Sequence, residues 1–381
     1  MISDVFTAKV ESIASTGAGV LSKMGQRVFV DGVAPCDVVR ARITEEHRNW
    51  ATAEVVDIVE PSLKRRAPLC PLFGICGGCS LQHLVYDAQI KAKATILKDA
   101  FIHIGGLSEL PELIIKQNKE NEFGYRNRVR FHVGRQGQIG FKAKRSEEII
   151  PLYQANPPEV KICPVADTGI NAFLKSNPSL KREATVYSFK DIFLIEGEKG
   201  KSRGKVRILD RDIILDAGVF FQSNALMLEE LVKDILSLAG EAKGPYLDVY
   251  SGVGTFAAFL QDFSPALDII EEDKTALAIA RENIKNLGEI FAVSSDSWAR
   301  IQNTKKYGLV IVDPPRQGLS SFFRNRLCKD HPPVIIYVSC NPATLARDSK
   351  AFVQADYRLA SLSMFDFYPQ TAHIESLAVF C

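Results

Sequence analysis

From about Gly244 to its end, the chain alternates apolar strands with helical segments, and this alternation restricts the possible folds more than any other feature. The strand-like runs are "YLDVY", "ALDII", "YGLVIVD", "VIIYVS" and "SLAVF". Helical stretches such as "DKTALAIARENIKNLG" and "PATLARDSKAFVQ" lie between them. Strands that are apolar on both faces need helices on both sides, so the pattern predicts a doubly wound, mostly parallel sheet. We expect an α/β Rossmann-like domain over residues 221–381.

The first 60 residues differ, because they consist of short runs of alternating β-branched and polar residues separated by glycine-rich turns. The strand-like pieces are "VFTAKVESI", "QRVFV", "DVVRARI" and "ATAEVVDIV". They predict a small OB-like β-barrel of about five strands over residues 1–60. Small barrels often bind oligonucleotides, although the pattern fits a scaffold equally well. The stretch "EPSLKRRAP" (Glu60–Pro68), with two prolines and no periodicity, marks the boundary.

Residues 61–220 form a third region, which we expect to be rich in β-structure. One helix is expected from Tyr86 to about Ile104, followed by β-like pieces such as "RNRVRFHVG", "QIGFK" and "TVYSFKDIFLIEG". Between Lys64 and Arg145, fifteen lysines and arginines stand against six acidic residues, although the whole chain carries only +2. A basic segment suits a polyanion such as nucleic acid, but from charge alone a solvated charged surface is slightly the better explanation.

The chain has no signs of export or membrane insertion. No apolar stretch approaches the roughly 20 residues that span a bilayer. The N-terminus "MISDVFTAKVES" carries acidic residues early and lacks the apolar core of a signal peptide. We therefore expect a cytoplasmic protein without membrane contact, whose eight cysteines are reduced, metal-bound or catalytic rather than paired in disulfides.

The segment "LDVYSGVGTFA" (Leu247–Ala257) reads as a strand, a glycine-rich turn and the start of a helix. Gly252 and Gly254 allow a sharp turn and a close approach of the backbone to a ligand at the helix N-terminus. Glu271 ends the next strand, where a carboxylate can accept hydrogen bonds from both ribose hydroxyls. The pattern predicts a nucleoside-containing cofactor and does not separate NAD from S-adenosylmethionine.

A second segment, "LVIVDPPRQG" (Leu309–Gly318), ends a strand with Asp-Pro-Pro-Arg. Its two prolines stiffen the loop and place Asp313 at the carboxyl edge of the sheet, where ligands bind. Asp-Pro-Pro at this place is typical of methyltransferases that act on planar nitrogen or base substrates. Arg316 stands where an aromatic residue usually follows in enzymes that methylate exocyclic amines, which counts against that reaction.

The segment "LCPLFGICGGCSLQH" (Leu69–His83) contains Cys70, Cys76 and Cys79 within ten residues. Close thiolates in a cytosolic protein indicate a metal site, and Cys163 in "KICPV" is the fourth ligand that we expect. Four thiolates fit zinc and an iron–sulfur cluster equally well.

Two further segments carry possible catalytic groups. Cys340 ends a strand in "YVSCNPATLARD", and a cysteine at such a position is more often inert than reactive. His373 and Glu375 in "FYPQTAHIES" should reach the same edge of the sheet if the strand order is the usual one. A glutamate beside a nucleophile and a cofactor site is a candidate base.

Taken together, these segments resemble the S-adenosylmethionine-dependent RNA uracil-C5 methyltransferases, which include bacterial 23S rRNA enzymes and tRNA relatives. "FFQSN", "LDVYSGVGTF", "DPPRQG", "YVSCNPATLARD" and "TAHIES" follow the order of the family's catalytic segments. "FGICGGCSLQH" resembles its cluster-binding region, and the N-terminal strands resemble a TRAM domain, an RNA-binding barrel. The resemblance implies a seven-stranded sheet in the methyltransferase domain and a 4Fe–4S cluster in the central one.

The resemblance also implies roles for individual residues. Cys340 would attack uracil C6, Glu375 would accept the C5 proton, and Asp313 would lie between cofactor and base. The residues matching S-adenosylmethionine contacts are Gln222, Tyr250, Thr255, Glu271, Asp296 and Asp313, with Ser295 as an alternative to Asp296. The matching cluster ligands are Cys70, Cys76, Cys79 and Cys163.

The resemblance further implies a flipped uridine in the pocket, with Phe220, Phe221 or Tyr125 available to stack on it. We expect a monomer that acts on 23S rRNA, with tRNA as the alternative substrate. Two functions of other classes fit parts of the sequence. An NAD-linked iron–sulfur oxidoreductase would leave Cys340 and Glu375 without a role, and a catalytically inactive RNA-binding factor would not need Cys340.

Overall fold

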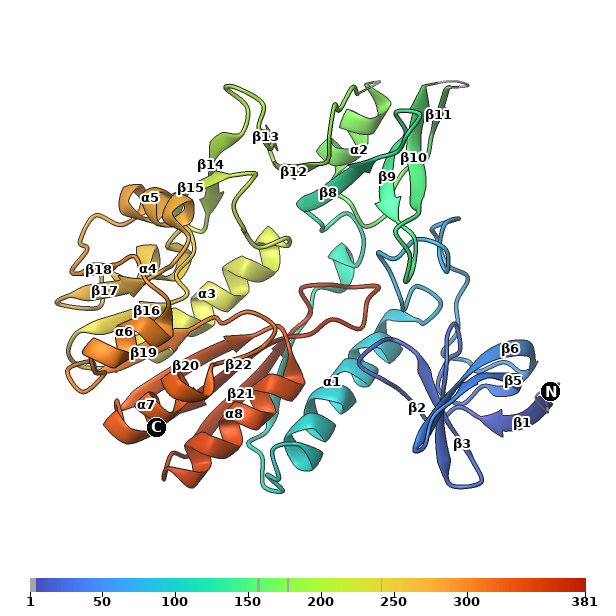
Figure 1. Cartoon of the computed structure of the whole chain (residues 1–381), viewed down its shortest axis with the longest axis horizontal. Coiled ribbons are helices and arrows are strands. Elements are labelled where there is room, and N and C mark those ends of the chain that lie inside the picture. Colours follow the sequence, from blue (N-terminus) through green and yellow to red (C-terminus); the bar gives the residue numbers. More distant parts are fainter. Residues whose placement is uncertain (1–4, 156–157, 177, 241) are drawn as a thin grey trace.

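The computed structural model describes residues 5–155, 158–176, 178–240 and 242–381. Within these ranges the strands form four sheets. Figure 1 shows the N-terminal strands and the C-terminal sheet on opposite sides of helix α1 (Tyr86–His103), with the green central strands above them. The predicted helix from Tyr86 to about Ile104 is confirmed.

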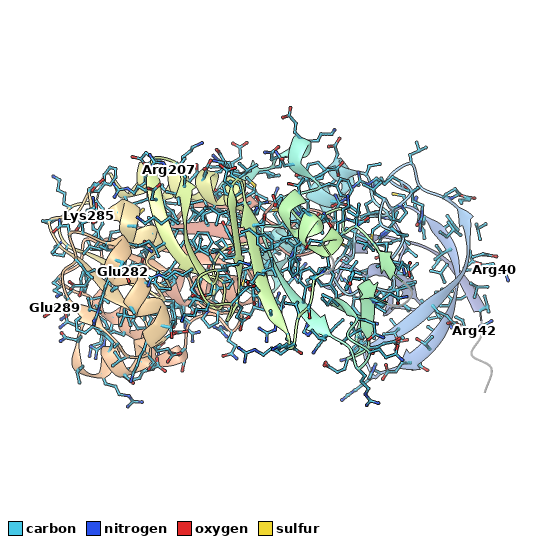
Figure 2. The ribbon with its side chains drawn as sticks, turned by 90° about the horizontal axis from the view of Figure 1, so that it is seen from above. Arg40, Arg42, Arg207, Glu282, Lys285 and Glu289 are labelled. Atoms are coloured by element: carbon cyan, nitrogen blue, oxygen red, sulfur yellow. The ribbon has the colours of Figure 1, made fainter. Side chains whose placement is uncertain are left out.

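Six strands cover the N-terminal region and form one sheet in the order β1-β5-β6-β4-β3-β2. They are β1 (Val5–Lys9), β2 (Ser12–Ile13), β3 (Gly19–Lys23), β4 (Gln26–Val30), β5 (Val38–Glu46) and β6 (Trp50–Glu60). Along β5, Val39 and Ala41 are buried, whereas Arg40 and Arg42 point outward (Figure 2). This alternation places one face of the sheet on an apolar core. The strand count is six where the sequence predicted about five.

The central region contains a second six-stranded sheet, in the order β11-β10-β9-β8-β12-β13. Its elements are β8 (Arg128–Val133), β9 (Ile139–Lys142), β10 (Ile149–Ala155), β11 (Pro158–Val160), α2 (Thr168–Lys175), β12 (Ala184–Phe189) and β13 (Ile192–Ile195). Phe131 and Val186 of the sheet pack with Ile170 of α2 in one buried cluster. The β-rich character predicted for this region is confirmed.

The C-terminal region folds as a doubly wound sheet in the order β18-β17-β16-β19-β20-β22-β21-β7. Strands β18 to β20 are parallel to one another, and β22 runs antiparallel to β20. The strands are β16 (Tyr246–Val249), β17 (Leu267–Ile270), β18 (Ile290–Phe291), β19 (Leu309–Val312), β20 (Val334–Ser339), β21 (Leu359–Phe365) and β22 (Glu375–Phe380). The helices are α3 (Ala225–Ala239), α4 (Thr255–Leu260), α5 (Lys274–Asn283), α6 (Ser295–Ile301), α7 (Ser321–Asp330) and α8 (Pro342–Gln354).

The central region contributes one strand to this sheet. Strand β7 (Leu113–Lys116), preceding the 3-10 turn η1 (Lys119–Asn121), pairs in parallel with β21 and makes the sheet eight-stranded. Leu97 and Phe101 of α1 are fully buried in the core that lies under one face of the sheet. The predicted seven strands are therefore one too few, because the pairing of so short a strand depends on a distant partner rather than on local sequence.

A hairpin of β14 (Arg203–Ile208) and β15 (Arg211–Asp216) precedes α3. Val206 and Leu215 of the hairpin pack in the same cluster as Leu231 of α3 and Phe256 of α4. The hairpin, although it lies before residue 221, therefore contributes to the core of the C-terminal α/β domain.

Candidate active site

A cavity of about 700 Å³ opens at one edge of the C-terminal sheet. Four lining residues directly follow parallel strands: Tyr250 follows β16, Glu271 follows β17, Asp313 follows β19 and Cys340 follows β20. The carboxyl ends of parallel strands meet at one edge, where open α/β sheets bind their ligands. Glu375 is the first residue of the antiparallel strand β22 and therefore reaches the same edge.

The glycine-rich turn brings backbone to this cavity. Gly252 and Gly254 have φ of 55° and 77°, which residues with a side chain rarely adopt. A Cβ on Gly254 would lie 2.9 Å from Ile284 Cδ1 and 3.1 Å from Ala280 Cβ, so α5 packs directly on the turn. The Gly252 N–H donates to Glu271 Oε2 at 2.8 Å. This bond fixes the carboxylate at the cavity wall while each of its oxygens keeps a further lone pair free.

Four of the six residues expected to contact the cofactor line this cavity, namely Gln222, Tyr250, Glu271 and Asp313. Gln222 follows the hairpin and precedes α3, so it enters from outside the sheet. Thr255, the first residue of α4, and Asp296 in α6 are not among the lining residues.

The resemblance left open whether Ser295 or Asp296 contacts the cofactor, and the structure shows the hydrogen-bond partners of both side chains. The Tyr250 hydroxyl and Ser295 Oγ are 2.8 Å apart, so the buried serine supports the cavity wall through Tyr250. Asp296 accepts a hydrogen bond from Ser320 Oγ, the N-cap of α7. Both side chains thus have partners in neighbouring elements.

The acids of the cavity strongly affect one another. Burial raises the pKa of Asp313 to about 7. Burial and the nearby Asp313 raise the pKa of Glu375 well above its usual range, with Arg316 opposing this shift. Burial, Glu375 and Asp313 together raise the pKa of the Cys340 thiol to about 11, and Arg316 again opposes the shift. The site therefore favours protonated groups until positive charge enters it.

The Asp-Pro-Pro-Arg loop is fixed by the segment that follows Cys340. Asn341 Nδ2 donates to the Arg316 carbonyl at 2.8 Å, and Thr344 Oγ1 donates to it at 3.3 Å. Arg347 donates to the carbonyls of Gln317 and Leu319 at 3.1 and 3.0 Å. The "NPATLAR" stretch after the cysteine thereby holds the neighbouring loop at the rim of the cavity.

A second, smaller cavity of about 170 Å³ lies in the central region. All four predicted cysteine ligands, Cys70, Cys76, Cys79 and Cys163, line it. Burial is the main reason why the pKa of Cys79 rises to about 12 and that of Cys163 to about 11. Within the described part of the chain, no three His, Cys, Asp or Glu side chains are arranged as the site of a single metal ion, and the four thiols of this cavity are no exception.

Comparisons with known proteins agree on one family. The family model described as tRNA (uracil-5-)-methyltransferase matches residues 195–380. An RNA methyltransferase of Treponema denticola is 32% identical, with 94% of both chains covered. The chain belongs to the family of RNA uracil-C5 methyltransferases.

Two further relatives in this family carry more detailed names. A 23S rRNA (uracil(1939)-C(5))-methyltransferase of Marinomonas is 28% identical over 99% of this chain and 94% of its own. The crystal structure of the tRNA (uracil-54, C5)-methyltransferase of Pyrococcus abyssi, in complex with S-adenosyl-L-homocysteine, superposes with a TM-score of 0.75. That protein is 26% identical, and the match covers 99% of this chain and 100% of that one. This chain therefore has the fold of an S-adenosylmethionine-dependent methyltransferase.

The active cavity of this uracil-C5 methyltransferase also contains residues that the sequence did not indicate. Arg126 and Arg128 line it from the start of the central sheet, and Tyr368 lines it from the loop before β22, as does His373, which the sequence had placed at this edge. The segment around Arg126 and Arg128 has no spacing that indicates a site, because it reaches the cavity only through packing. The only sequence signal for these two arginines was the basic composition of residues 64–145.

Of the three aromatic residues considered for stacking, one is exposed at the cavity and the other two are buried. Phe220 lines the cavity and is 61% exposed, and the Arg128 guanidinium lies 5.8 Å from its ring. Phe221 and Tyr125 are buried in the core. In the described ranges of this methyltransferase, no helix has the length and apolarity that crossing a membrane requires.

Proposed function

We propose that this methyltransferase transfers a methyl group from S-adenosylmethionine to C5 of a uridine in 23S rRNA, through a covalent bond between Cys340 Sγ and uracil C6. The observation that supports this proposal is that Cys340, Glu375 and Asp313 line one cavity with the glycine-rich turn. A nucleophile, an acid and a cofactor turn around one space are the groups that the reaction needs.

Uracil C5 is a poor nucleophile, and addition of a thiolate at C6 makes C5 an enolate carbon. That carbon takes the methyl group from the sulfonium, which leaves S-adenosylhomocysteine. Glu375 then accepts the C5 proton, and the C6–S bond breaks to restore the double bond and the Cys340 thiolate. Each turnover therefore releases one proton, which originates at C5.

The charges of the cavity fit this sequence of steps. Arg316 opposes the rise in the pKa of both Cys340 and Glu375, so it favours the thiolate and the carboxylate. A positively charged sulfonium in the same cavity would also lower the pKa of the acids. We infer that cofactor binding promotes the ionised form of Glu375.

The substrate is proposed to be RNA, and 23S rRNA in preference to tRNA. The named 23S rRNA relatives from Marinomonas and Alkalilimnicola cover 98–99% of this chain, which favours rRNA. A uridine within folded RNA must flip to reach Cys340. Phe220 with Arg128 beside it offers an exposed ring on which a flipped base can stack.

For the N-terminal sheet we propose a TRAM-like, OB-related role in RNA binding. Its strand β5 carries outward-pointing Arg40 and Arg42, although each of them also pairs with an acid of β6. We further propose that the protein acts in the cytoplasm and as a monomer.

For the cysteine cavity we propose a 4Fe–4S cluster. Four thiols are among the residues that line a cavity of about 170 Å³, whereas about 10–15 Å³ on the same kind of measure is enough to hold one water molecule. A single zinc ion would hold each sulfur about 2.3 Å from the metal, so the four thiols would have to lie closer together than around a cluster. Cys70, Cys76, Cys79 and Cys163 would hold the cluster, which would supply a fold-stabilising link between segments and no step of methyl transfer.

The test is tritium release from C5-labelled uridine in unmodified 23S rRNA and in tRNA transcripts. Anaerobically purified protein is given S-adenosylmethionine and run beside Cys340→Ala and the matched control Cys328→Ala, whose thiol lies outside the cavity. We expect cofactor-dependent release from 23S rRNA with the wild type and the control, and none with Cys340→Ala. Release from neither RNA, with S-adenosylhomocysteine still bound, would overturn the proposal in favour of an inactive RNA-binding factor.

A further inference from the structure

The loop between β21 and β22, residues 366–374, leads directly into Glu375. Gln370 lies near its middle, is fully buried and has a φ of 69°, a conformation that non-glycine residues seldom adopt. It does not line the active cavity. A buried, polar residue in a strained conformation next to a catalytic segment needs strong contacts to stay in place.

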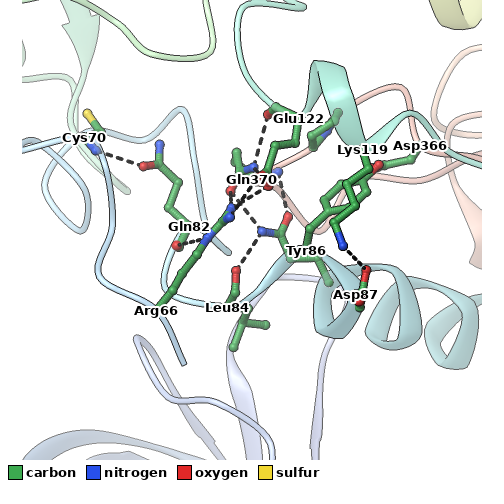
Figure 3. Close-up of polar contacts among 12 residues, drawn as sticks. Arg66, Cys70, Gln82, Leu84, Tyr86, Asp87, Lys119, Glu122, Asp366 and Gln370 are labelled. Carbon is green, nitrogen blue, oxygen red and sulfur yellow. Dashed lines mark hydrogen bonds and ion pairs between the residues drawn. The ribbon is translucent and has the colours of Figure 1, made fainter. Parts of the chain in front are cut away.

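Gln370 receives such contacts from segments far away in the sequence (Figure 3). Its Oε1 accepts from Arg66 Nη2 at 2.8 Å and from Gln89 Nε2 at 2.9 Å. Its Nε2 donates to the Glu122 carbonyl and to Glu122 Oε2, both at 3.1 Å. Its own N–H donates to Gln89 Oε1 at 2.8 Å. The amide therefore joins three segments that all precede β16 in the sequence.

The same residue is tied to the cysteine-bearing segment. The N–H groups of Ser80 and Leu81, which directly follow Cys79, donate to the Gln370 carbonyl at 3.0 and 2.9 Å. Two positions later in the loop, the Ala372 N–H donates to Ser80 Oγ at 3.0 Å. A shift of the segment around Cys79 would thus move the loop that leads to Glu375.

Arg66 also links Gln370 to the cysteine-bearing segment. Its Nε donates to the Gln82 carbonyl at 3.2 Å, and Gln82 Oε1 accepts from the Cys70 N–H at 3.0 Å (Figure 3). Arg66 also holds Glu122 in a two-pronged pair at 2.8 and 3.0 Å. Its charge is therefore balanced, and one side chain links the cysteine segment, Glu122 and Gln370.

We propose that Gln370 is a positioning residue that holds Glu375 in place for removal of the C5 proton and couples that geometry to the cysteine-bearing segment. This inference rests on the proposed uridine methylation. Gln370 acts through the loop and touches neither cofactor nor substrate. Its loss should slow proton removal and leave cofactor binding intact.

The test compares Gln370→Ala and Gln370→Asn with wild type. Asparagine tolerates the left-handed conformation but has a shorter side chain, so it separates backbone strain from the lost contacts. Misplacement of a catalytic group by about 1 Å costs roughly 100-fold. We expect both variants to release tritium about 10- to 100-fold more slowly, to bind S-adenosylhomocysteine as wild type does, and to accumulate a covalent protein–RNA adduct that survives denaturing electrophoresis.

The C5-methylated adduct is the readout that a merely structural role would not produce, because it accumulates only when thiolate addition and methyl transfer proceed and removal of the C5 proton is slow. Gln261→Ala is the matched control, since Gln261 is also a buried amide, whose Oε1 accepts from the Lys285 and Asn286 N–H groups at 2.7 and 2.9 Å, away from the loop. It should lower the melting temperature without accumulating adduct. Arg66→Met breaks the same network from the opposite side and should reproduce the adduct.

Wild-type turnover by Gln370→Asn, or loss of turnover without any adduct in both Gln370→Asn and Arg66→Met, would overturn the positioning role. If the wild type itself releases no tritium, the proposed methylation fails instead, so the two failures are distinguishable. A double variant of Arg66 and Gln370 should be no slower than the slower single variant, because residues of one unit are not additive.

Discussion

Ser339 of β20 pairs with Ser376 of β22, and this one antiparallel register brings Cys340 and Glu375 to the same edge of the sheet. Each of the two residues lies next to its paired serine in the sequence. The relative placement of the proposed nucleophile and base therefore depends on backbone hydrogen bonds between two central strands. Such a framework can hold reacting groups within small tolerances.

The raised pKa of Cys340 predicts slow alkylation of the free protein. Below its pKa of about 11 the thiol is protonated, and only the thiolate reacts. The rate of iodoacetamide labelling at Cys340, followed by peptide mass spectrometry, should rise about tenfold for each pH unit from 7 to 9. A rate that is flat over this range would contradict the raised pKa.

Replacing Glu375 by glutamine should make Cys340 more reactive while it abolishes turnover. Glu375 raises the pKa of the thiol, so removing its charge lowers that pKa and increases the thiolate at a given pH. Labelling at pH 9 should be faster in Glu375→Gln than in wild type, and slower in Arg316→Met, which loses the opposing cation. The same direction of change in both variants would contradict this electrostatic account.

Glu271→Gln should weaken cofactor binding. The carboxylate is held at the cavity by the Gly252 and Asp273 N–H groups, each at 2.8 Å, and is the proposed acceptor of the ribose hydroxyls. Hydrogen bonds to charged groups contribute about 1.5–3 kcal/mol, so the Kd for S-adenosylhomocysteine should rise roughly tenfold or more in calorimetric titration. The exposed neighbour provides the control, since Glu272→Gln should bind as wild type does.

Lys93→Met should strongly destabilise the fold. Lys93 and Asp366 form a fully buried ion pair at 2.5 Å, and Lys93 also donates to the Tyr368 carbonyl at 2.9 Å. Removing one partner leaves a buried charge and typically costs about 3–5 kcal/mol. Denaturant unfolding should show this loss, whereas Lys98→Met, an exposed change on the same helix, should show almost none. Equal unfolding midpoints for the two variants would count against the role of the pair.

The cysteine cavity leads to a prediction about iron. Anaerobically purified protein should contain iron and sulfide, and Cys79→Ser or Cys163→Ser should lose both and melt at a lower temperature. The exposed Cys381 is the control, since Cys381→Ser should keep the metal content unchanged. Bound zinc without sulfide in the wild type would refute the cluster and leave a mononuclear site.

Many lining residues of the candidate active cavity could be predicted from the sequence because they stand at strand ends. Tyr250, Glu271, Asp313 and Cys340 each follow a parallel strand, and parallel strands converge at one edge whatever the details of packing. The apolar runs and the glycine-rich turn carry this information within a few neighbouring residues. For the same reason, the doubly wound fold and the helix from Tyr86 were predictable.

Long-range packing governed the remaining features, which no local pattern encodes. Strand β7 joins the sheet as its eighth member, and Arg126 and Arg128 enter the cavity from the central region. Gln370 forms hydrogen bonds with Arg66, Gln89 and Glu122. Periodicity reports which face of an element is buried, but it does not report which distant element covers that face. The contacts of Gln370 form only when distant segments pack together. Buried polar groups then need hydrogen-bond partners, and these come from the segments that lie beside them.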